Sequence, residues 1–334
     1  MKIAVIFDSP HPEWDDAAFK REVDAKVEEA EYDVARALLA QGHEVRLIGI
    51  GEEIGPLLEG LAALQPKLVF NGCEAFRGHA RHEYAVAAVL DMYGYRYTGS
   101  PPAALLVARN KSLTKKILAY HKIRVPAFAE FHEGDALVRP SELRFPLIVK
   151  PLLEDASVGI AQASVVDDDD DLIERVAFIH KKYHQAAIVE ELVEGRELYV
   201  GLLGNDDVEV LPLTEITFGA NDTDTAEHRI ATYKAKWDEE YRKRKKIRNV
   251  FAKGLSEGVT ARIGQICRTA FHALSLHDYA RIDVRLTHDD QVYVLEVNPN
   301  PFIAAEHELA NAAEKAGLKY NAFIQRIVDE AMAR

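Results

Sequence analysis

Apolar and polar residues alternate in two short segments near the C-terminal end of the chain, residues 280–286 and 292–298. A period of two is typical of β-strands, because successive side chains of a strand point to opposite faces of the sheet. The sequence THDDQ at 287–291 separates the two segments and has the composition of a turn. The pattern therefore predicts an antiparallel hairpin.

The predicted hairpin has one polar face and one apolar face. Arg281, Asp283 and Arg285 share a face of the first strand, and a loop of even length without a bulge would place Glu296 and Asn298 on the same side. The other face would carry Ile282, Val284, Leu286, Tyr293, Leu295 and Val297. Carboxylate and amide oxygens suit Mg²⁺, which keeps water and substrate phosphate in its shell. A sheet with one solvated face is the commoner cause of such alternation, and the pattern alone leaves both interpretations open.

The first hundred residues alternate between strand-like and helix-like segments. Continuous apolar runs at 2–7, 43–50 and 67–72 are typical of buried parallel strands. Apolar residues at helical spacing lie between and after these runs, and they predict helices over 15–41, 52–64 and 80–93. This order predicts an open parallel sheet with helices on both faces. No Gly-x-Gly-x-x-Gly motif follows the first strand, so dinucleotide binding is not expected.

The pattern changes after about residue 103. A helix is predicted over 103–121, and an apolar strand then ends at Lys150. The loop that follows, 152–166, is rich in small residues, whose backbone can approach a phosphate closely and offer its N–H groups. Most loops of this kind are only turns, so the loop is a weak signal by itself. The acidic run 167–171 is interpreted as a solvated helix start rather than a calcium site.

Length and composition narrow the class of protein. A chain of 334 residues exceeds what one core usually supports, and we expect three domains, at 1–102, 103–190 and 191–334. The net charge of −13 argues against nucleic acid and anionic membranes as partners. Two cysteines without a CxxC motif indicate a reducing compartment. Together with the lack of a signal-peptide pattern or a membrane-length apolar run, these features predict a cytoplasmic protein.

Several motifs occur in the order that is typical of ATP-grasp enzymes. They are RNKSLTKKIL at 109–118, FPLIVKP at 145–151, DASVG at 155–159, IVEELVEGRELYVGLLG at 188–204, ARIDVR at 280–285 and LEVNPNP at 295–301. Over nearly its whole length the chain resembles the D-alanine–D-alanine ligase branch of this superfamily, and YTGSPPAALLVARNKSLTK at 97–115 strengthens the match. The resemblance implies an α/β fold, in which a parallel-sheet N-terminal domain precedes a two-lobed α+β ATP-grasp module.

The resemblance implies a site for ATP between the two lobes. Two lysines would contact the phosphates as compact charges, a segment between the lobes would meet the adenine through backbone groups, and a glutamate would accept hydrogen bonds from the ribose. The corresponding residues here are Lys111 and Lys150, then Glu190, Glu191, Leu192 and Val193, and finally Glu197.

The resemblance also assigns the polar face of the hairpin. Asp283, Glu296 and Asn298 match the ligands of Mg²⁺, for which Mn²⁺ can substitute, and Arg281 matches the arginine that stabilises a tetrahedral oxyanion. Ser157 matches the serine of the small-residue loop, near the phosphate and the first substrate.

The segment 218–249 matches a mobile lid. Within it, TYKAKWDEEY supplies Lys236 as the best candidate for a lysine that contacts ATP, and Trp237 stands where the ligases often carry tyrosine. The basic run 242–246 is interpreted as a solvated edge of the lid rather than a nucleic-acid site.

The implied reaction joins two small molecules. In this family ATP phosphorylates a substrate carboxylate, and an amine then attacks the acyl phosphate to form an amide. Mg²⁺ and lysines neutralise the charge on the transferring phosphoryl group. The expected partners are therefore a carboxylate and an amine, with no nucleic acid and no membrane, while a homodimer is left open.

Two departures from the ligase pattern concern the substrates. The Gly-Gly-x-Ser-x-Glu-like stretch of D-alanine ligases is replaced by FDSPHPEWDDAAFKREV at 7–23, so no glutamate is assigned to the first substrate. Phe302 stands where the ligases carry glycine, and AAEHELANAA at 304–313 replaces their small and hydroxyl residues. We therefore expect a ligase that forms an amide or peptide bond on an amino acid or peptide other than D-alanine. A D-alanine–D-alanine ligase and a non-catalytic ATP-binding module are the alternatives, and the presence of all three metal ligands disfavours the latter.

Overall fold

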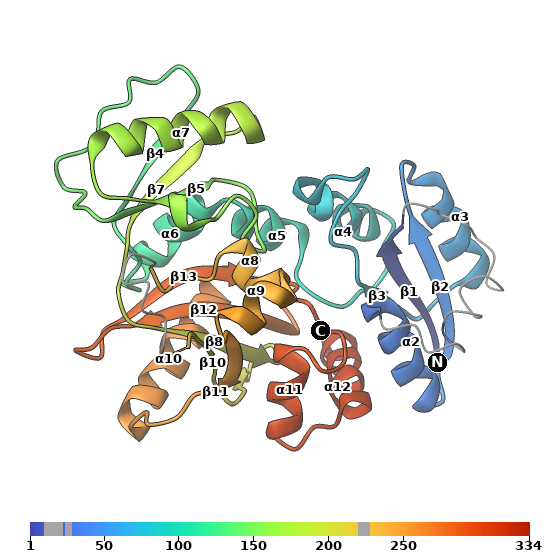
Figure 1. Cartoon of the computed structure of the whole chain (residues 1–334). Helices are drawn as coiled ribbons and strands as arrows, with labels where there is room; N and C mark the ends of the chain where they lie inside the picture. Colours follow the sequence, from blue (N-terminus) through green and yellow to red (C-terminus); the bar gives the residue numbers. More distant parts are fainter. Residues whose placement is uncertain (10–22, 24–28, 220–227) are drawn as a thin grey trace.

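The computed structural model describes residues 1–9, 23, 29–219 and 228–334. In this part of the chain the strands form three sheets, which are arranged as three bodies with helices around them (Figure 1). The predicted α/β class and the predicted order of a parallel sheet followed by antiparallel sheets are confirmed. The first part of the predicted helix 15–41, most of the segment 7–23 and residues 220–227 of the predicted lid lie outside the described residues.

The N-terminal sheet is parallel, with the strand order β2-β1-β3. Its strands are β1 (Lys2–Asp8), β2 (Glu44–Ile50) and β3 (Leu68–Asn71). Alternate residues of β1 enter two different cores: Ile3 and Val5 contribute to one, and Ala4 and Ile6 to the other. Helices must therefore cover both faces, as the continuous apolar run predicts. They are α2 (Ala30–Ala40), α3 (Gly55–Leu64) and α4 (Glu83–Met92), the last preceded by the 3-10 turn η1 (Ala80–His82).

The last helix of the chain completes one of these two cores. Helix α12 (Tyr320–Ala333) contributes Phe323, Ile324 and Ile327 to the cluster that contains Ile3 and Val5. In Figure 1 α12 lies next to α2, although the two helices stand at opposite ends of the sequence. The N-terminal body is therefore built from both ends of the chain, and the predicted boundary at residue 102 stays a prediction.

The central sheet is antiparallel, with the order β4-β7-β5-β6. Its strands are β4 (Phe128–Phe131), β5 (Leu147–Pro151), β6 (Val165–Val166) and β7 (Ala187–Glu191), and the turn η2 (Gln162–Ser164) precedes β6. Helix α7 (Asp169–Tyr183) covers one face (Figure 1). The Asp168 carboxylate accepts a hydrogen bond from the Asp171 N–H, so the acidic run caps and begins this helix, as predicted.

The C-terminal sheet has the order β11-β10-β8-β12-β13, with β9 paired to β8. Its strands are β8 (Arg196–Leu203), β9 (Glu209–Val210), β10 (Thr214–Thr217), β11 (Arg248–Phe251), β12 (Tyr279–Leu286) and β13 (Val292–Asn298). Helix α10 (Glu257–Ala273) packs on the apolar face of this sheet, where Ile263 and Phe271 are fully buried. The remaining helices near it are α8 (Tyr233–Trp237), α9 (Glu239–Arg244) and α11 (Glu308–Lys315).

The hairpin of β12 and β13 is confirmed. The expected even loop length and the expected absence of a bulge were both wrong, and their effects on the side that Glu296 faces offset each other. The loop 287–291 has an odd number of residues, and the pairing register shifts by one residue beyond Asp283. Leu295 is the extra residue of this bulge, because Glu296 pairs with Asp283 while Val294 pairs with Val284. The apolar face therefore carries Val292 and Val294 in place of Tyr293 and Leu295. Glu296 still lies on the polar side.

The single helix predicted over 103–121 is two helices, α5 (Pro102–Arg109) and α6 (Lys111–Tyr120). The break is at Asn110, whose backbone is extended and whose side-chain oxygen accepts a hydrogen bond from the Leu113 N–H. An asparagine in this position caps the second helix, and this capping competes with continuous helix. Ala104 and Leu118 belong to the core of the C-terminal sheet, so the boundaries of the predicted domain 103–190 stay predictions. Within the described ranges, every helix is too short or too polar to span a bilayer.

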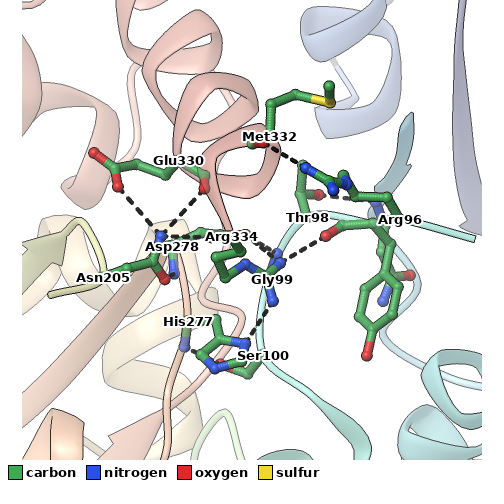
Figure 2. Close-up of polar contacts among 12 residues, drawn as sticks. Arg96, Thr98, Gly99, Ser100, Asn205, His277, Asp278, Glu330, Met332 and Arg334 are labelled. Atoms are coloured by element: carbon green, nitrogen blue, oxygen red, sulfur yellow. Dashed lines mark hydrogen bonds and ion pairs between the residues drawn. The ribbon is translucent and has the colours of Figure 1, made fainter. Parts of the chain in front are cut away.

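A buried polar cluster connects the segment that follows the N-terminal sheet, loops of the C-terminal sheet and the last residue of the chain (Figure 2). The Asp278 carboxylate accepts hydrogen bonds from the Gly99 N–H at 2.8 Å, from Asn205 Nδ2 at 3.1 Å and from Arg334 at 3.1 Å. Gly99 has a φ of +88°, and a Cβ on it would lie 2.5 Å from Asn300 Oδ1. Glycine is therefore required where the chain leaves the N-terminal sheet and passes the end of β13.

We expect Asp278→Asn to lower the free energy of unfolding by about 1–3 kcal/mol, because one acceptor oxygen becomes an NH₂ group and leaves a buried donor unpaired. Asp278 is fully buried and has a φ of +62°, which asparagine also tolerates, so the substitution tests the acceptor oxygens rather than the backbone. Denaturant unfolding measures the effect. Asp169→Asn is the control, because its ion pair with Arg139 is exposed and should contribute less than about 0.5 kcal/mol. Equal losses in both variants would contradict the expectation.

Candidate functional site

Two adjoining cavities lie between the sheets. The wide cleft has a volume of about 1290 Å³, and the narrow cavity has a volume of about 70 Å³. The narrow cavity is lined by Ile148 and Lys150 of the central sheet and by Glu197 and Asp283 of the C-terminal sheet. It therefore lies between the two lobes that the sequence predicts.

Every predicted site residue lines at least one of these cavities. The walls of the narrow cavity include Lys111, Lys150, Ser157, Glu190, Glu191, Val193, Glu197, Lys236, Asp283 and Glu296. The walls of the wide cleft include Lys111, Lys236, Arg281, Glu296 and Asn298. Three charged residues, Lys111, Lys236 and Glu296, are common to both, so they stand where the two cavities meet.

The polar face of the hairpin forms one side of this junction. Asp283 pairs with Glu296 across the two strands, and Arg281 pairs with Asn298. The Arg281 guanidinium donates to both oxygens of Asp283, at 2.7 and 3.0 Å. Asn298 donates its Nδ2 hydrogens to the Arg281 carbonyl at 3.3 Å, which leaves its side-chain oxygen as an acceptor. The four side chains therefore form one ordered group on a rigid part of the sheet.

The charge of Glu296 is set by its neighbours. Burial alone would raise the pKa of Glu296, but nearby cations, with Lys111 the strongest, outweigh it and lower the pKa to about 2. The Lys111 ammonium lies 3.3 Å from Glu296 Oε1 and also donates to the Glu154 carbonyl. Glu296 is therefore an anion at neutral pH.

Asp283, Glu296 and Asn298 could hold a divalent cation. Their carboxylate and amide oxygens come from two adjacent cross-strand positions, and these are hard donors of the kind that Mg²⁺ takes. Asp283 Oδ1 lies 3.4 Å from the Asn298 amide nitrogen. Both carboxylate oxygens of Asp283 accept hydrogen bonds from Arg281. A cation would therefore share the Asp283 carboxylate with Arg281 and the Glu296 carboxylate with Lys111. The Asn298 side-chain oxygen would be its third ligand.

Lys150 and Glu190 form a buried ion pair on the wall of the narrow cavity. Their charged atoms lie 2.8 Å apart, and Glu190 is only 1% exposed. A third member was missed in the sequence: Lys115 lies 3.4 Å from Glu190 and donates to the Leu295 carbonyl at 2.9 Å. Burial lowers the pKa of Lys115 to about 8. Lys115 stands four residues after Lys111, on the same side of α6, and this spacing could have indicated it as a site residue.

The predicted adenine-reading segment at the end of β7 offers, among the described residues, the Val193 N–H as a free backbone donor. The Glu191 N–H donates to the Ala127 carbonyl at 2.9 Å, and the Leu192 N–H donates to the Pro146 carbonyl at 3.0 Å. The Val193 N–H has no hydrogen-bond partner among the described residues, and Val193 lines the narrow cavity. Of the predicted adenine-reading N–H groups, this one stays available for a ligand.

Glu197 is held by Arg285, which the sequence pattern placed on the polar face of the hairpin. Arg285 donates to the Glu197 carboxylate at 2.7 Å, and both side chains are less than 10% exposed. Arg285 also donates to the Gly195 carbonyl at 3.1 Å. The salt bridge fixes the direction of the Glu197 carboxylate at the edge of the narrow cavity.

The small-residue loop approaches the lid. Ala156 and Ser157 have φ values of +49° and +63°, a conformation that costs energy in residues other than glycine. Their N–H groups have no partner in the described ranges. The Ser157 hydroxyl donates to the Ala231 carbonyl at 2.7 Å, and Trp237 Nε1 donates to the Ala156 carbonyl at 3.0 Å. The predicted lid thus touches the loop, while the N–H groups of Ala156 and Ser157 have no partner among the described residues.

The far wall of the wide cleft contains the residues that replace the ligase pattern. The rings of Phe302 and His307 meet edge to face with their centroids 4.7 Å apart. Glu308, in the first turn of α11, accepts a hydrogen bond from Asn249 of β11. All four side chains line the cleft, so an aromatic ring and a carboxylate occupy this end of it.

Another part of the cleft wall carries an ion-pair cluster that the sequence did not reveal. Arg109 lies 2.6 Å from Glu83 and 2.8 Å from Asp155. Burial raises the pKa of Glu83 to about 7, against the opposing effect of Arg109. The cluster links α4, α5 and the small-residue loop. Its members are far apart in sequence. Arg109 and Asp155 begin two of the motifs named above, but nothing local in the sequence pairs them with each other or with Glu83.

Comparison with known proteins gives matches over most of the chain. A family model described as the D-ala D-ala ligase C-terminus matches residues 117–329. The uncharacterized protein y4sG of Sinorhizobium fredii is 31% identical over 306 residues, which are 90% of this chain and 87% of that protein. The D-alanine–D-alanine ligase of Aquifex aeolicus is 31% identical over 314 residues, 92% of this chain and 96% of that protein.

A solved structure has a similar fold. The crystal structure of the D-alanine–D-alanine ligase from Bacillus anthracis complexed with ATP superposes with a TM-score of 0.76 at 21% sequence identity. The match covers 100% of this chain and 98% of that one. All three bodies of the fold therefore have counterparts in that enzyme.

Proposed function

Since the chain belongs to the D-alanine–D-alanine ligase family of ATP-grasp ligases, we propose that it uses ATP to join a carboxylate to an amine other than D-alanine. The observation that carries the reaction class is the junction of the two cavities. Lys111, Lys236 and Glu296 line both of them. A nucleotide in the narrow cavity and two small molecules in the wide cleft would therefore meet at the same charged groups.

The proposed reaction has two steps, each of which forms one bond and breaks another. A carboxylate oxygen of the first substrate takes the terminal phosphoryl group of ATP, and ADP leaves. The amine of the second substrate then attacks the acyl carbon, phosphate leaves, and the amine nitrogen loses a proton. The products are an amide, ADP and phosphate.

The residues of the narrow cavity supply binding and orientation. Lys111 and Lys150 would neutralise phosphate oxygens, Glu197 is aimed by Arg285 to accept hydrogen bonds from ribose hydroxyls, and the Val193 N–H offers a donor to the adenine edge. Glu190 holds Lys150 in place through its ion pair. Each role uses a group that is already oriented by the protein.

The hairpin supplies the metal ligands and one catalytic cation. Asp283, Glu296 and Asn298 would hold Mg²⁺, which withdraws charge from phosphate oxygens when it is bound. Arg281 would stabilise the oxyanion at the acyl carbon, and its contact with Asp283 fixes its orientation. Lys236 and Ser157 come to the same junction from the lid and the small-residue loop.

The substrate assignment rests on the far wall of the cleft. The Phe302 ring and the Glu308 carboxylate occupy the end where a second substrate would sit. A D-alanine–D-alanine ligase is the second candidate, favoured by the 31% identity to the Aquifex aeolicus enzyme over 92% of this chain.

A screen for phosphate release tests the proposal. Pairs of amino acids, dipeptides and related amines would be offered with ATP and Mg²⁺, and products would be identified by mass. We expect release that needs both a carboxylate and an amine, with a condensed product. If the protein binds Mg·ATP but no substrate pair causes phosphate release, the non-catalytic alternative is supported instead.

Lys150→Ala is expected to weaken Mg·ATP binding about tenfold, which corresponds to about 1.4 kcal/mol, because a charged partner of the phosphates is lost. Titration calorimetry measures the affinity. Lys116→Ala is the matched control, because Lys116 lies on α6 with its side chain exposed and paired with Glu130. Unchanged affinity in the Lys150 variant would remove Lys150 from the phosphate site.

A further inference from the structure

Tyr199 is a buried residue of the wide cleft that is not among the predicted site residues. Tyr199 is in β8, is 4% exposed and lines the wide cleft. Its backbone pairs with Asp283 of β12 on one side and with Thr214 of β10 on the other. The position of its ring is therefore fixed by the centre of the sheet.

Two cations of the proposed site face this ring. The Arg281 Cζ lies 5.1 Å from the centre of the Tyr199 ring, and the Lys236 Nζ lies 6.0 Å from it. A cation within about 6 Å of an aromatic face is attracted by the negative charge above the ring. The two like charges would otherwise repel each other, and the ring gives both a favourable contact without adding a net charge.

The hydroxyl and the edge of the ring have partners of their own. The Tyr199 hydroxyl lies 3.3 Å from Glu197 Oε1, whose carboxylate is held by Arg285. The ring also packs with Ala235 of α8 and with Ile247, next to β11. Lys236 follows Ala235 directly in α8. The apolar contact between Tyr199 and Ala235 therefore places Lys236 near the Tyr199 ring.

We propose that Tyr199 is a positioning residue that holds Arg281 and the lid lysine Lys236 on one aromatic surface at the phosphate end of the site. The inference rests on the proposed function, because that function gives the two cations their roles. An ordinary core tyrosine would explain the burial and the packing. It would not explain two cations over the ring and a hydroxyl tied to the proposed ribose ligand.

The test changes the charge distribution of the ring while keeping its shape. Tyr199 would be replaced by phenylalanine and then by mono-, di- and trifluorinated phenylalanine. Each ring in this series has nearly the same size as the one before it, but its face attracts a cation less strongly. Binding of Mg·ATP and of adenosine would be measured by calorimetry. Adenosine has no phosphate, so it reports on the pocket without Lys236.

We expect Tyr199→Phe to bind Mg·ATP within about twofold of wild type, because the ring remains. Affinity for Mg·ATP should then fall stepwise with fluorination, to about fivefold to tenfold in the trifluorinated protein, while adenosine binding stays constant. Once a substrate pair is known, turnover should fall in the same order, because Arg281 would be held less firmly beside the reacting carbon. A flat series, or equal losses for ATP and adenosine, would overturn the inference.

Two further measurements separate positioning from packing. Phe218→Leu removes a ring from the same cluster without a contact to either cation, and it should lower thermal stability without a selective loss of ATP affinity. Tyr199→Leu should lower both. A wild-type protein that fails to bind Mg·ATP would overturn the proposed function itself, which is a different result from a flat fluorination series.

Discussion

Glu296→Gln is expected to reduce turnover by about a hundredfold or more while the fold survives, because a charged ligand to the metal is worth several kcal/mol of transition-state stabilisation. Glutamine has nearly the same shape and stays in register opposite Asp283. It lacks the negative charge that the surrounding cations maintain by lowering the pKa of Glu296 to about 2. Lys111 would also lose its carboxylate partner at 3.3 Å.

Phosphate release at saturating ATP, measured with the substrate pair found in the screen, gives the turnover. A titration with Mg²⁺ should show a higher half-saturating concentration in the variant. Glu239→Gln is the control, because Glu239 lines the same cleft but is exposed and pairs with the exposed Lys243. Wild-type turnover in the Glu296 variant would exclude Glu296 as a metal ligand.

Wild-type protein is expected to form little or no D-alanyl-D-alanine, on the order of a hundredfold less than its preferred amide, and Phe302→Gly should raise this side activity. The Phe302 ring lines the cleft and is held edge to face by His307. A second substrate that fits a smaller pocket wall would be displaced by the ring, and a misplacement of about 1 Å can cost on the order of a hundredfold in rate.

The measurement follows phosphate and dipeptide together in the presence of ATP, Mg²⁺ and D-alanine. The variant Leu106→Ala serves as a control, because Leu106 is exposed on α5 and is not part of the cleft wall. Robust synthesis of the dipeptide by the wild type at millimolar D-alanine would sink the substrate assignment and restore the plain D-alanine–D-alanine ligase.

Much of the fold could be read from hydrophobic periodicity. The three parallel strands, the acidic start of α7 and the final hairpin follow from patterns that are local in sequence. The break at Asn110 was missed, because a capping side chain overrides a continuous helical pattern. The bulge at Leu295 was also missed, since a one-residue slip in register depends on how β12 packs and leaves no clear mark in the sequence.

The candidate site divides in the same way. Motif order alone selected residues that line two adjoining cavities, although their roles stay predictions. Lys115, Arg285 and Tyr199 gained their places only in three dimensions. Each of them acts on a partner from another strand or helix, namely Glu190, Glu197 and Arg281.

Most strands and helices, and the residues of the polar face of the hairpin, follow from the order of residues along the chain. Backbone periodicity and side-chain chemistry are properties of neighbouring residues, so they are visible in one dimension. Which charges pair depends on the packed fold. Electrostatic and cation–π contacts depend on distances of a few ångström, and those distances are set by sheet register, by the bulge of β13 and by the packing of the lid on Tyr199.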